Sequence, residues 1–295
     1  MDALQRFERP GRYLIVFTLG FFALCAQTLL FRRFLTVYEG TELGIAGFFG
    51  TWLLWVALGA LAARPRSSWS DRLLRRFEWM PLLHPAVFLV PFVVIPSTRA
   101  LAGVTTYELF PLDRMLAATF VLNAPVSIVT GLSFVLACRW TAGRERLPVA
   151  RVYICEGVGS FTGGVAVTLG LGMGLPDETL FCGAALTAAV AVALYGAIRG
   201  GRPVAAWLVI AAAAGALLTG MDRRWARSGR RDAWTRLLPA ESFAGSFATP
   251  QARYLYGQHR GQFNVIAWES VVESIPDVEH SSELLALHLA QHPEA

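Results

Sequence analysis

The chain has 295 residues, of which 55% are hydrophobic and only 16% are charged. A soluble domain carries about 25% charged residues, so this composition favours lipid as the surrounding solvent. The formal net charge is +5 and all 26 basic residues are arginine, yet most of them lie beside apolar runs. Arginines in such positions set membrane topology, and we expect no nucleic acid among the partners.

Apolar segments follow one another between residues 13 and 220, after a polar N-terminus at residues 1–12. Each approaches the about 20 residues that a helix needs to cross the hydrocarbon core. The first segment is a full-length apolar run with no small-residue cleavage site, which indicates a retained span and disfavours a cleaved signal peptide. We therefore expect a polytopic α-helical membrane protein with about seven transmembrane helices. The segments are residues 13–31, 43–63, 80–96, 115–138, 152–175, 180–198 and 204–220.

The third segment is the weakest of the seven predictions. It carries Pro81, Pro85, Pro91 and Pro96, and prolines within a span must be compensated by neighbouring helices or by a water-lined cavity. A broken or re-entrant helix is the alternative.

Arginine-rich segments alternate along the chain and predict its orientation. The N-terminus and the loops at 64–76, 139–151 and 199–202 are rich in arginine, and such loops face the cytoplasm. Seven spans in the cell inner membrane then place the tail on the outer, periplasmic side. The arginine-rich connector at 221–239 would itself prefer the cytoplasm and therefore opposes this orientation. The arginines of the loops narrowly outweigh those of the connector.

Residues 240–295 predict a small α+β soluble tail. The β-rich runs 253–258 and 262–268 flank a His-Arg-Gly turn and predict a β-hairpin, with 271–275 as a third strand. Leucines at helical spacing predict a helix over 281–292 with Ser281 as its N-cap. Because such a tail buries little apolar surface, we expect it to dock on a protein partner.

Glu156 is the strongest candidate for chemistry within the spans. An ionised carboxylate in an apolar stretch is costly and faces a partner or a wet cavity. A structural ion pair with Arg151 or Arg139 is the favoured interpretation, and a transport or proton-relay role is the alternative.

Three uncharged polar residues accompany Glu156 in the predicted spans. We expect Gln27 and Asn123 to hydrogen-bond to neighbouring helices. His84 is interpreted as a hydrogen-bonded core histidine, with haem or metal ligation as the alternative. His288 and His292 have a spacing that can bind zinc, but they lack the acidic residue of the H-E-x-x-H motif, so we expect no metal. Cys25, Cys138, Cys155 and Cys182 form no C-x-x-C pattern, and we expect no cofactor.

Two clusters at the predicted spans carry structural interpretations. Gly159 and Gly163 form a G-x-x-x-G pattern with Gly164 beside it, which predicts close packing of two helices. Arg32 and Arg33 end the first span, with Glu39 and Glu42 in the following loop. Interfacial anchoring is the favoured interpretation of this outer-face cluster, and an anion-binding or partner-binding site is the alternative.

Four stretches of the sequence resemble membrane-bound spermidine synthase-like proteins, in which a multi-span region precedes an aminopropyltransferase domain. The first two spans resemble the opening of that family, and the fifth resembles its glycine-rich helix. The tail resembles the hairpin and first helix that lead into the catalytic domain. The stretches are GFFALCAQTLLFRRFLTVYEGTELGIAGFFGTWLLWVALGALAA, VYICEGVGSFTGG, SFATPQARYLYGQHRGQFNVIAWES and SIPDVEHSSELLALHLAQHP.

The resemblance implies a membrane-embedded scaffold or split subunit that presents its tail to a partner. In the family a strand and a glycine-rich loop for S-adenosyl nucleotide follow the tail helix, and we expect neither these nor catalytic residues in residues 1–295. The chain would then be catalytic only when completed by a missing domain or partner chain. The family often has an Asn-Gly or Asp-Gly turn where this chain has Trp268, Glu269 and Ser270. A small-molecule transporter, of polyamine-like or other solutes, and a membrane anchor of a multi-subunit complex are the alternatives.

Overall fold

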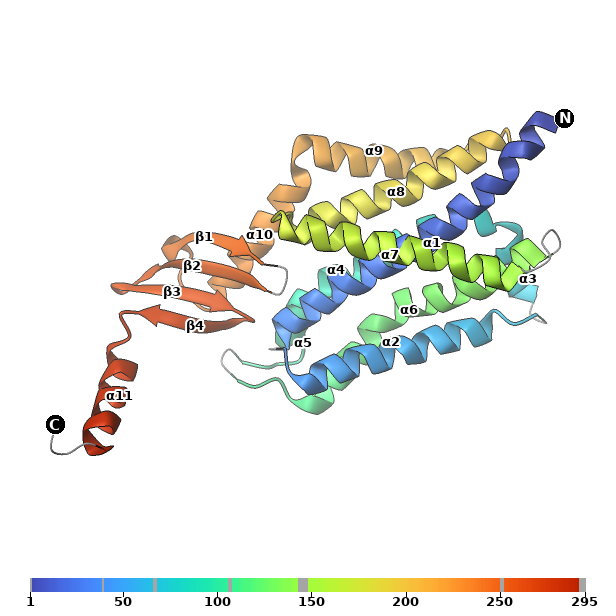
Figure 1. Ribbon diagram of the computed structural model, residues 1–295. Coiled ribbons are helices and arrows are strands. Elements are labelled where there is room, and N and C mark those ends of the chain that lie inside the picture. Colours follow the sequence, from blue (N-terminus) through green and yellow to red (C-terminus); the bar gives the residue numbers. More distant parts are fainter. Residues whose placement is uncertain are drawn as a thin grey trace.

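The chain folds into a bundle of apolar helices with a small sheet at one end (Figure 1). The computed structural model describes residues 2–38, 40–65, 68–105, 108–142, 148–249 and 252–291. The bundle comprises α1 (Asp2–Val37), α2 (Glu42–Ala62), α3 (Ser68–Arg75), η1 (Phe77–Trp79), α4 (Met80–Val94), η2 (Ile95–Ser97), α5 (Thr98–Leu101), α6 (Leu112–Ala142), α7 (Pro148–Gly172), α8 (Asp177–Ile198) and α9 (Val204–Thr219). It is followed by α10 (Met221–Thr235), η3 (Ala240–Ser242), β1 (Phe243–Ala248), β2 (Arg253–His259), β3 (Gln262–Ala267), β4 (Ser270–Ile275) and α11 (Val278–Gln291).

Six of the described helical segments are long and apolar enough to cross a membrane, and they coincide with the first six predicted spans. The seventh differs, because α9 has only 16 residues and the chain then bends by 68° into α10. Gly220 forms this bend with a φ of +68°, a left-handed conformation that ends helices and that glycine adopts at no steric cost. The described residues therefore hold six such segments, or seven if the bent pair is one span.

The proline-rich third segment forms a continuous helix over most of its length. α4 contains Pro85 and Pro91, and Pro81 lies in its first turn, where a missing N–H is tolerated. These prolines are buried, and α1, α6 and α8 pack around α4. The alternative of a broken or re-entrant helix over residues 80–96 is therefore wrong, because Phe77–Leu101 is one apolar helical segment that changes only to a 3-10 turn at η2.

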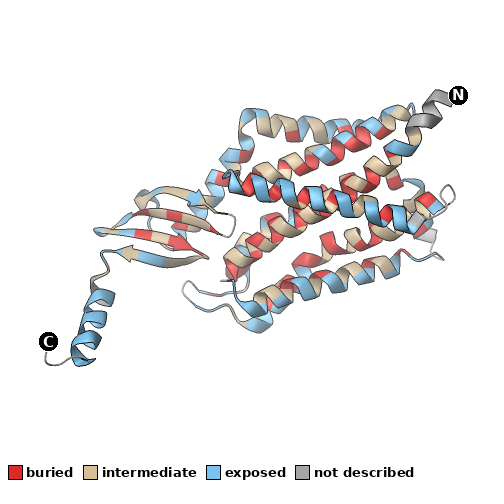
Figure 2. Ribbon diagram, viewed as in Figure 1, coloured by how far each residue is buried: buried red, intermediate tan, exposed pale blue. Residues whose placement is uncertain are grey.

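α1 lies at the centre of the bundle and contacts α4, α6, α7 and α8. Its buried residues include Phe22, which packs edge-on against Phe88 of α4. α2 and α7 instead carry many exposed residues on their outer faces (Figure 2), and these include Leu53 at 65% and Phe161 at 72% exposure. The bundle is thus apolar on the outside as well as inside.

Glycines bring α7 into backbone contact with α1. A Cβ on Gly159 or on Gly163 would collide with a carbonyl oxygen of α1, that of Phe17 or of Phe21. Gly164, the next residue of α7, faces the side chain of Leu24 in α1. Such small residues let two helices approach more closely than any larger side chain permits.

The sheet is an antiparallel meander in the order β1-β2-β3-β4. The predicted hairpin corresponds to β2 and β3, and the predicted third strand to β4. β1 is an additional strand that the sequence pattern does not predict. Its sequence FAGSFA contains no β-branched residue, so its propensity is low and pairing with β2 determines its structure.

Residues 221–239, expected to be a connector, form helix α10 over most of their length. Trp234 near its end is fully buried against Leu255 of β2 and Ile266 of β3. The Trp234 indole N–H donates to the carbonyl oxygen of Pro239 at 3.0 Å. α10 therefore supplies the central residue of the sheet's small core.

α11 begins three residues earlier than the sequence predicts. The Asp277 carboxylate accepts a hydrogen bond from the backbone N–H of His280 at 3.0 Å, which is the role of a cap. The prediction that Ser281 is the N-cap is therefore wrong, because Ser281 lies inside the helix. α11 projects away from the sheet and from the bundle (Figure 1).

We expect Gly159→Val to lower the free energy of unfolding by about 1–3 kcal/mol, because a branched side chain has no space between α7 and α1. Unfolding of the detergent-solubilised chain measures this. Gly157→Val on the same helix is the matched control, since a Cβ there meets nothing within 4 Å. Equal losses in both variants would assign the effect to helix propensity and would contradict the packing argument.

Candidate functional site

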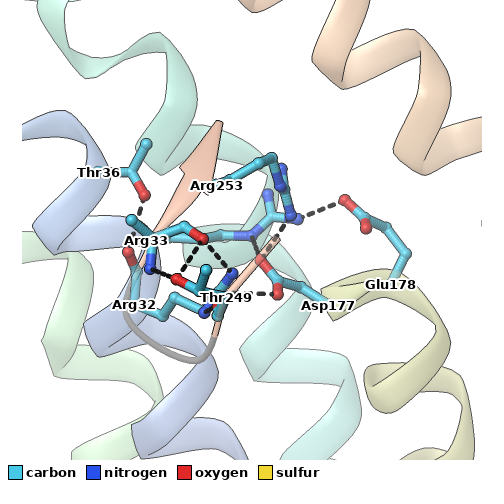
Figure 3. Close-up of polar contacts among 8 residues, drawn as sticks. Arg32, Arg33, Thr36, Asp177, Glu178, Thr249 and Arg253 are labelled. Atoms are coloured by element: carbon cyan, nitrogen blue, oxygen red, sulfur yellow. Dashed lines mark hydrogen bonds and ion pairs between the residues drawn. The ribbon is translucent and has the colours of Figure 1, made fainter. Parts of the chain in front are cut away.

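A cluster of buried charges joins the sheet to the bundle (Figure 3). Arg32 and Arg33 belong to the last turns of α1, Asp177 and Glu178 to the first turn of α8, and Arg253 begins β2. Arg32 Nε lies 3.3 Å from Asp177 Oδ1, and Arg33 Nη2 lies 2.6 Å from Glu178 Oε1. Arg253 Nη2 lies 3.0 Å from Asp177 Oδ2. Asp177 therefore connects both helices to the sheet.

Arg32 also holds the segment between β1 and β2. Its guanidinium donates to the carbonyl oxygens of Thr249 at 2.6 Å and of Ala252 at 3.3 Å. Arg32 is only 5% exposed, and a buried guanidinium needs acceptors for its N–H groups. The segment supplies these acceptors, so the sheet completes the environment of a bundle residue.

The cluster forms where the end of α1 meets the first residues of α8 and of β2. Asp177 and Glu178 follow Pro176 and open α8, where carboxylates interact favourably with the positive end of the helix dipole. The guanidinium of Arg33 lies over the ring of Phe92 in α4, with Cζ 3.4 Å from the ring centroid, and donates to the Phe92 carbonyl oxygen at 2.6 Å. The guanidinium plane is thereby fixed between an aromatic face and a carboxylate.

A pocket of about 320 Å³ opens beside the cluster. Arg236 forms part of its far wall, where Nη1 lies 2.8 Å from Glu269 Oε1 and donates to the carbonyl oxygen of Pro96 at 2.6 Å. A second hollow of about 210 Å³ shares Arg236 and Glu269 as wall residues. The remaining wall of the larger pocket includes Val37, Val93, Trp225, Ser228, Gly229 and Asp232.

The turn between β3 and β4 holds Glu269 in an unfavourable backbone conformation. Trp268 and Glu269 have φ values of +51° and +55°, which cost a residue other than glycine roughly 1–2 kcal/mol each. An Asn-Gly pair is the favoured sequence for such turns. The ion pair of Glu269 with Arg236 offsets part of this cost. Strain of this kind accumulates at functional sites, which directs attention to the pocket that Glu269 lines.

The expected outer-face cluster is present only in part. Arg32 and Arg33 lie together, but their carboxylate partners are the acidic pair of α8. Glu42 lies in the first turn of α2, next to the N-cap Thr41, and Glu39 lies outside the described residues. Arg32 is buried and Arg33 is half-buried at the junction, a position that differs from that of an exposed interfacial anchor.

Sequence reasoning missed Asp177, Glu178, Arg236, Arg253 and Glu269. The acidic pair had a signal, because it lies between two apolar segments at the same end of the predicted bundle as the double arginine. The tail residues had none, since no local pattern shows which side chains of a strand or a turn will meet a helix far away in the sequence.

Glu156 and His84 line one small cavity inside the bundle, about 10 Å³ in volume, which is space for about one water molecule. His84 is fully buried, and its Nδ1 lies 3.3 Å from the Met80 carbonyl oxygen. Arg139, one expected partner of Glu156, lies 2.6 Å from Asp71 instead. The cavity is too small for a solute larger than water.

The other polar candidates occupy structural positions. Asn123 Nδ2 of α6 donates to the Phe48 carbonyl oxygen at 3.0 Å and to Thr51 Oγ1 at 2.9 Å, both in α2. Gln27 is half-buried on α1. In the part of the chain that the structure describes, no three His, Cys, Asp or Glu residues gather as a metal site, and His292 lies outside that part.

No protein-family model, curated protein or solved structure matches the chain.

We expect Asp177→Asn to destabilise the junction by about 3–5 kcal/mol, because it leaves the buried Arg32 and the half-buried Arg253 without their shared counter-charge. Unfolding of the full chain and the rate of tryptic cleavage between α10 and β2 measure the loss. Asp232→Asn, an exposed change in the same pocket, is the control. Cleavage as slow as in the unchanged protein would contradict the anchoring role.

The raised pKa of Glu269 predicts that the stability of the junction depends on pH. Burial raises the pKa of Glu269 above its ordinary value of 4.5, and the nearby Arg236 and Arg99 lower this pKa only in part. The folded state therefore binds the proton more tightly than the unfolded state, and the stability gained from it is lost as the pH rises through the raised pKa. Relative to Glu269→Gln, the unchanged protein should lose stability just above pH 4.5. Unfolding curves measured across this range test it, and a constant difference between the two proteins would refute it.

Proposed function

We propose that the chain is a multi-pass membrane protein of the spermidine synthase-like kind, whose bundle holds the sheet and α11 at one membrane surface as a scaffold for a protein partner. The charge cluster carries this proposal. Asp177 links α1, α8 and β2 through ion pairs with Arg32 and Arg253. A sheet attached only by a flexible linker would not need buried ion pairs to the bundle. A sheet that presents a binding surface to a partner needs a fixed orientation, and these ion pairs provide it.

The outer faces of the helices support a lipid environment. Only 17% of the apolar window in the Glu42–Ala62 segment and 28% of that in the Val149–Gly172 segment are buried inside the protein. Soluble monomers rarely expose continuous apolar patches larger than a few hundred Å². Lipid tails cover such faces at no cost, and membrane lipid is accordingly a proposed partner.

The positions of the arginines support an orientation with the N-terminus in the cytoplasm and the sheet on the outer side of an inner membrane. The N-terminus and the sheet lie at opposite ends of the bundle (Figure 1). Fourteen arginines belong to the N-terminus and to the three loops at 64–76, 139–151 and 199–202. At the sheet end, Arg32, Arg33, Arg236 and Arg253 are paired with carboxylates, which weakens their opposing influence on topology. The arginines of α10 at the same end still oppose this orientation; they are Arg223, Arg224, Arg227, Arg230 and Arg231.

α11 supports the presence of a protein partner. Leu284, Leu285, Leu287 and Leu289 are between 48% and 60% exposed, although leucine is normally among the most buried residues. In the proteins that the tail resembles, a hairpin and helix of this kind lead into an aminopropyltransferase domain, so we propose a partner of that type. S-adenosyl nucleotides are cytoplasmic, and an external tail therefore favours a scaffold role over catalysis.

We expect the double variant Leu285→Asp and Leu289→Asp to abolish co-purification of the partner from native membranes, because charges replace the apolar contact. The unfolding temperature of the bundle should stay unchanged. The matched control is Ala286→Asp with Ala290→Asp, which places the same charges at the same spacing on a face of α11 rotated by about 100°.

Equal capture by both double variants would reject α11 as the docking helix, and the unchanged chain purifying alone would reject the scaffold. A reporter fused after α11 that is active only in the cytoplasm would overturn the orientation.

A further inference from the structure

α10 has one strongly basic face. The helix contains five arginines and two aspartates. Because successive residues of a helix are rotated by about 100°, the five arginines fall within an arc of about 120°. Four of their side chains are exposed, and the fifth, that of Arg230, is half-buried. The arginines are Arg223, Arg224, Arg227, Arg230 and Arg231.

The aspartates of α10 do not neutralise this face. Asp222 is 2% exposed and accepts a hydrogen bond from the Thr179 hydroxyl of α8. Asp232 lies on another side of the helix, about 140° from the centre of the arginine arc. Within the part of the chain that the structure describes, four of the arginines form no hydrogen bond or ion pair; they are Arg223, Arg224, Arg227 and Arg231.

Like charges repel one another at this face. Burial and the neighbouring Arg253 and Arg227 lower the pKa of Arg230, and the two carboxylates of α8 counteract this only in part. Charges of the same sign at close range disfavour the ionised form of each other. An anion beside the face would relieve this repulsion.

The preceding helix places α10 at the level of a membrane surface. α9 has 16 residues, which span about 24 Å at a rise of 1.5 Å per residue, whereas the hydrocarbon core is about 30 Å thick. The chain then bends by 68°, so a crossing α9 leaves α10 nearer to the membrane plane than to the membrane normal. Because arginine is costly inside hydrocarbon, α10 belongs in the headgroup layer.

Exposed apolar side chains lie directly before the arginines. Leu218 in the last turn of α9 is 87% exposed, and Met221 at the start of α10 is 60% exposed. Another face of α10 is held by protein, because Ala226 is buried and Trp225 packs edge-on against Phe92 of α4. Leu218 and Met221 favour a lipid over a nucleic acid, since only the lipid offers them hydrocarbon.

We propose that the arginine face of α10 binds the headgroups of anionic phospholipids such as phosphatidylglycerol. Anionic lipids attract clusters of about four to eight basic residues beside a span, and each residue near such a surface strengthens binding about fivefold. Guanidinium groups also donate paired hydrogen bonds to phosphate oxygens. Phosphatidylcholine offers the same phosphate without net charge, so the face should discriminate between the two lipids.

This inference rests on the membrane placement proposed above, and it depends neither on the scaffold role nor on the side of the membrane where α10 lies. A chain that stays dissolved without detergent would reject the placement and the lipid site together. A membrane chain without lipid preference would reject the lipid site alone.

The experiment is native mass spectrometry of the full chain in neutral maltoside detergent, with phosphatidylglycerol and phosphatidylcholine of identical acyl chains as the probes. We expect tighter binding of phosphatidylglycerol, weakened at least about tenfold in the triple variant Arg223→Gln, Arg224→Gln and Arg227→Gln. The same three positions changed to Lys keep the charge and should keep the binding. Because these side chains are exposed, unfolding temperatures without added lipid should agree among the three proteins.

A second triple variant controls for the loss of net charge. Arg72→Gln, Arg75→Gln and Arg76→Gln removes three exposed arginines at the opposite end of the bundle, at α3 (Figure 1), and should leave the tightest phosphatidylglycerol bound. Equal weakening by the two glutamine triples overturns the proposal. Equal binding of the two lipids, or a lysine triple as weak as the glutamine triple of α10, overturns it as well.

Discussion

Asp177 makes the contact on which the arrangement of bundle and sheet depends. It is 3% exposed and forms ion pairs with Arg32 of α1 and Arg253 of β2. Charges removed from water repay their desolvation only when the geometry satisfies them. The last turn of α1, the first turn of α8 and the start of β2 must therefore keep their mutual positions. The orientation of the sheet follows from that requirement.

Different forces hold the two parts of the molecule together. Within the bundle, glycines such as Gly159 and Gly163 bring helix backbones into contact, which is the contribution that remains when lipid cancels the hydrophobic drive between helices. The sheet instead uses one large side chain, Trp234, as the centre of its core. In the membrane position that we propose, the charge cluster between them lies at the surface, where both water and ions have access. Backbone contacts, a small apolar core and ion pairs thus stabilise the bundle, the sheet and the junction respectively.

Local patterns in the sequence predicted much of the fold. Runs of apolar residues gave six of the helices, and alternating residues gave the strands β2, β3 and β4, because both signals lie within about 20 neighbouring residues. The spacing of Gly159 and Gly163 likewise predicted close helix packing. β1 escaped prediction because its alanines, serine and glycine have no strand preference of their own. α10 escaped because its arginines concealed the buried face that ends in Trp234.

The site was less predictable than the fold, for a physical reason. The double arginine of α1 was visible, but its partners are chosen by the packing of helices, as the separation of 145 positions between Arg33 and Glu178 illustrates. Glu269 was noticed only as a departure from a favoured turn. Its reason for being there, the contact with Arg236, required the position of α10 relative to the sheet.

The ion pairs of α1 and α8 have a consequence for the order in which the protein is made. Arg32 and its acceptor Thr249 are 217 positions apart, a distance that a ribosome covers in roughly 10–40 s. During that interval two arginines of α1 can meet two carboxylates of α8 with no net charge left over, so the helices can assemble before the sheet exists. Arg253 arrives last and joins Asp177. The final docking of the sheet is thus the step that completes the ion pairs of the junction.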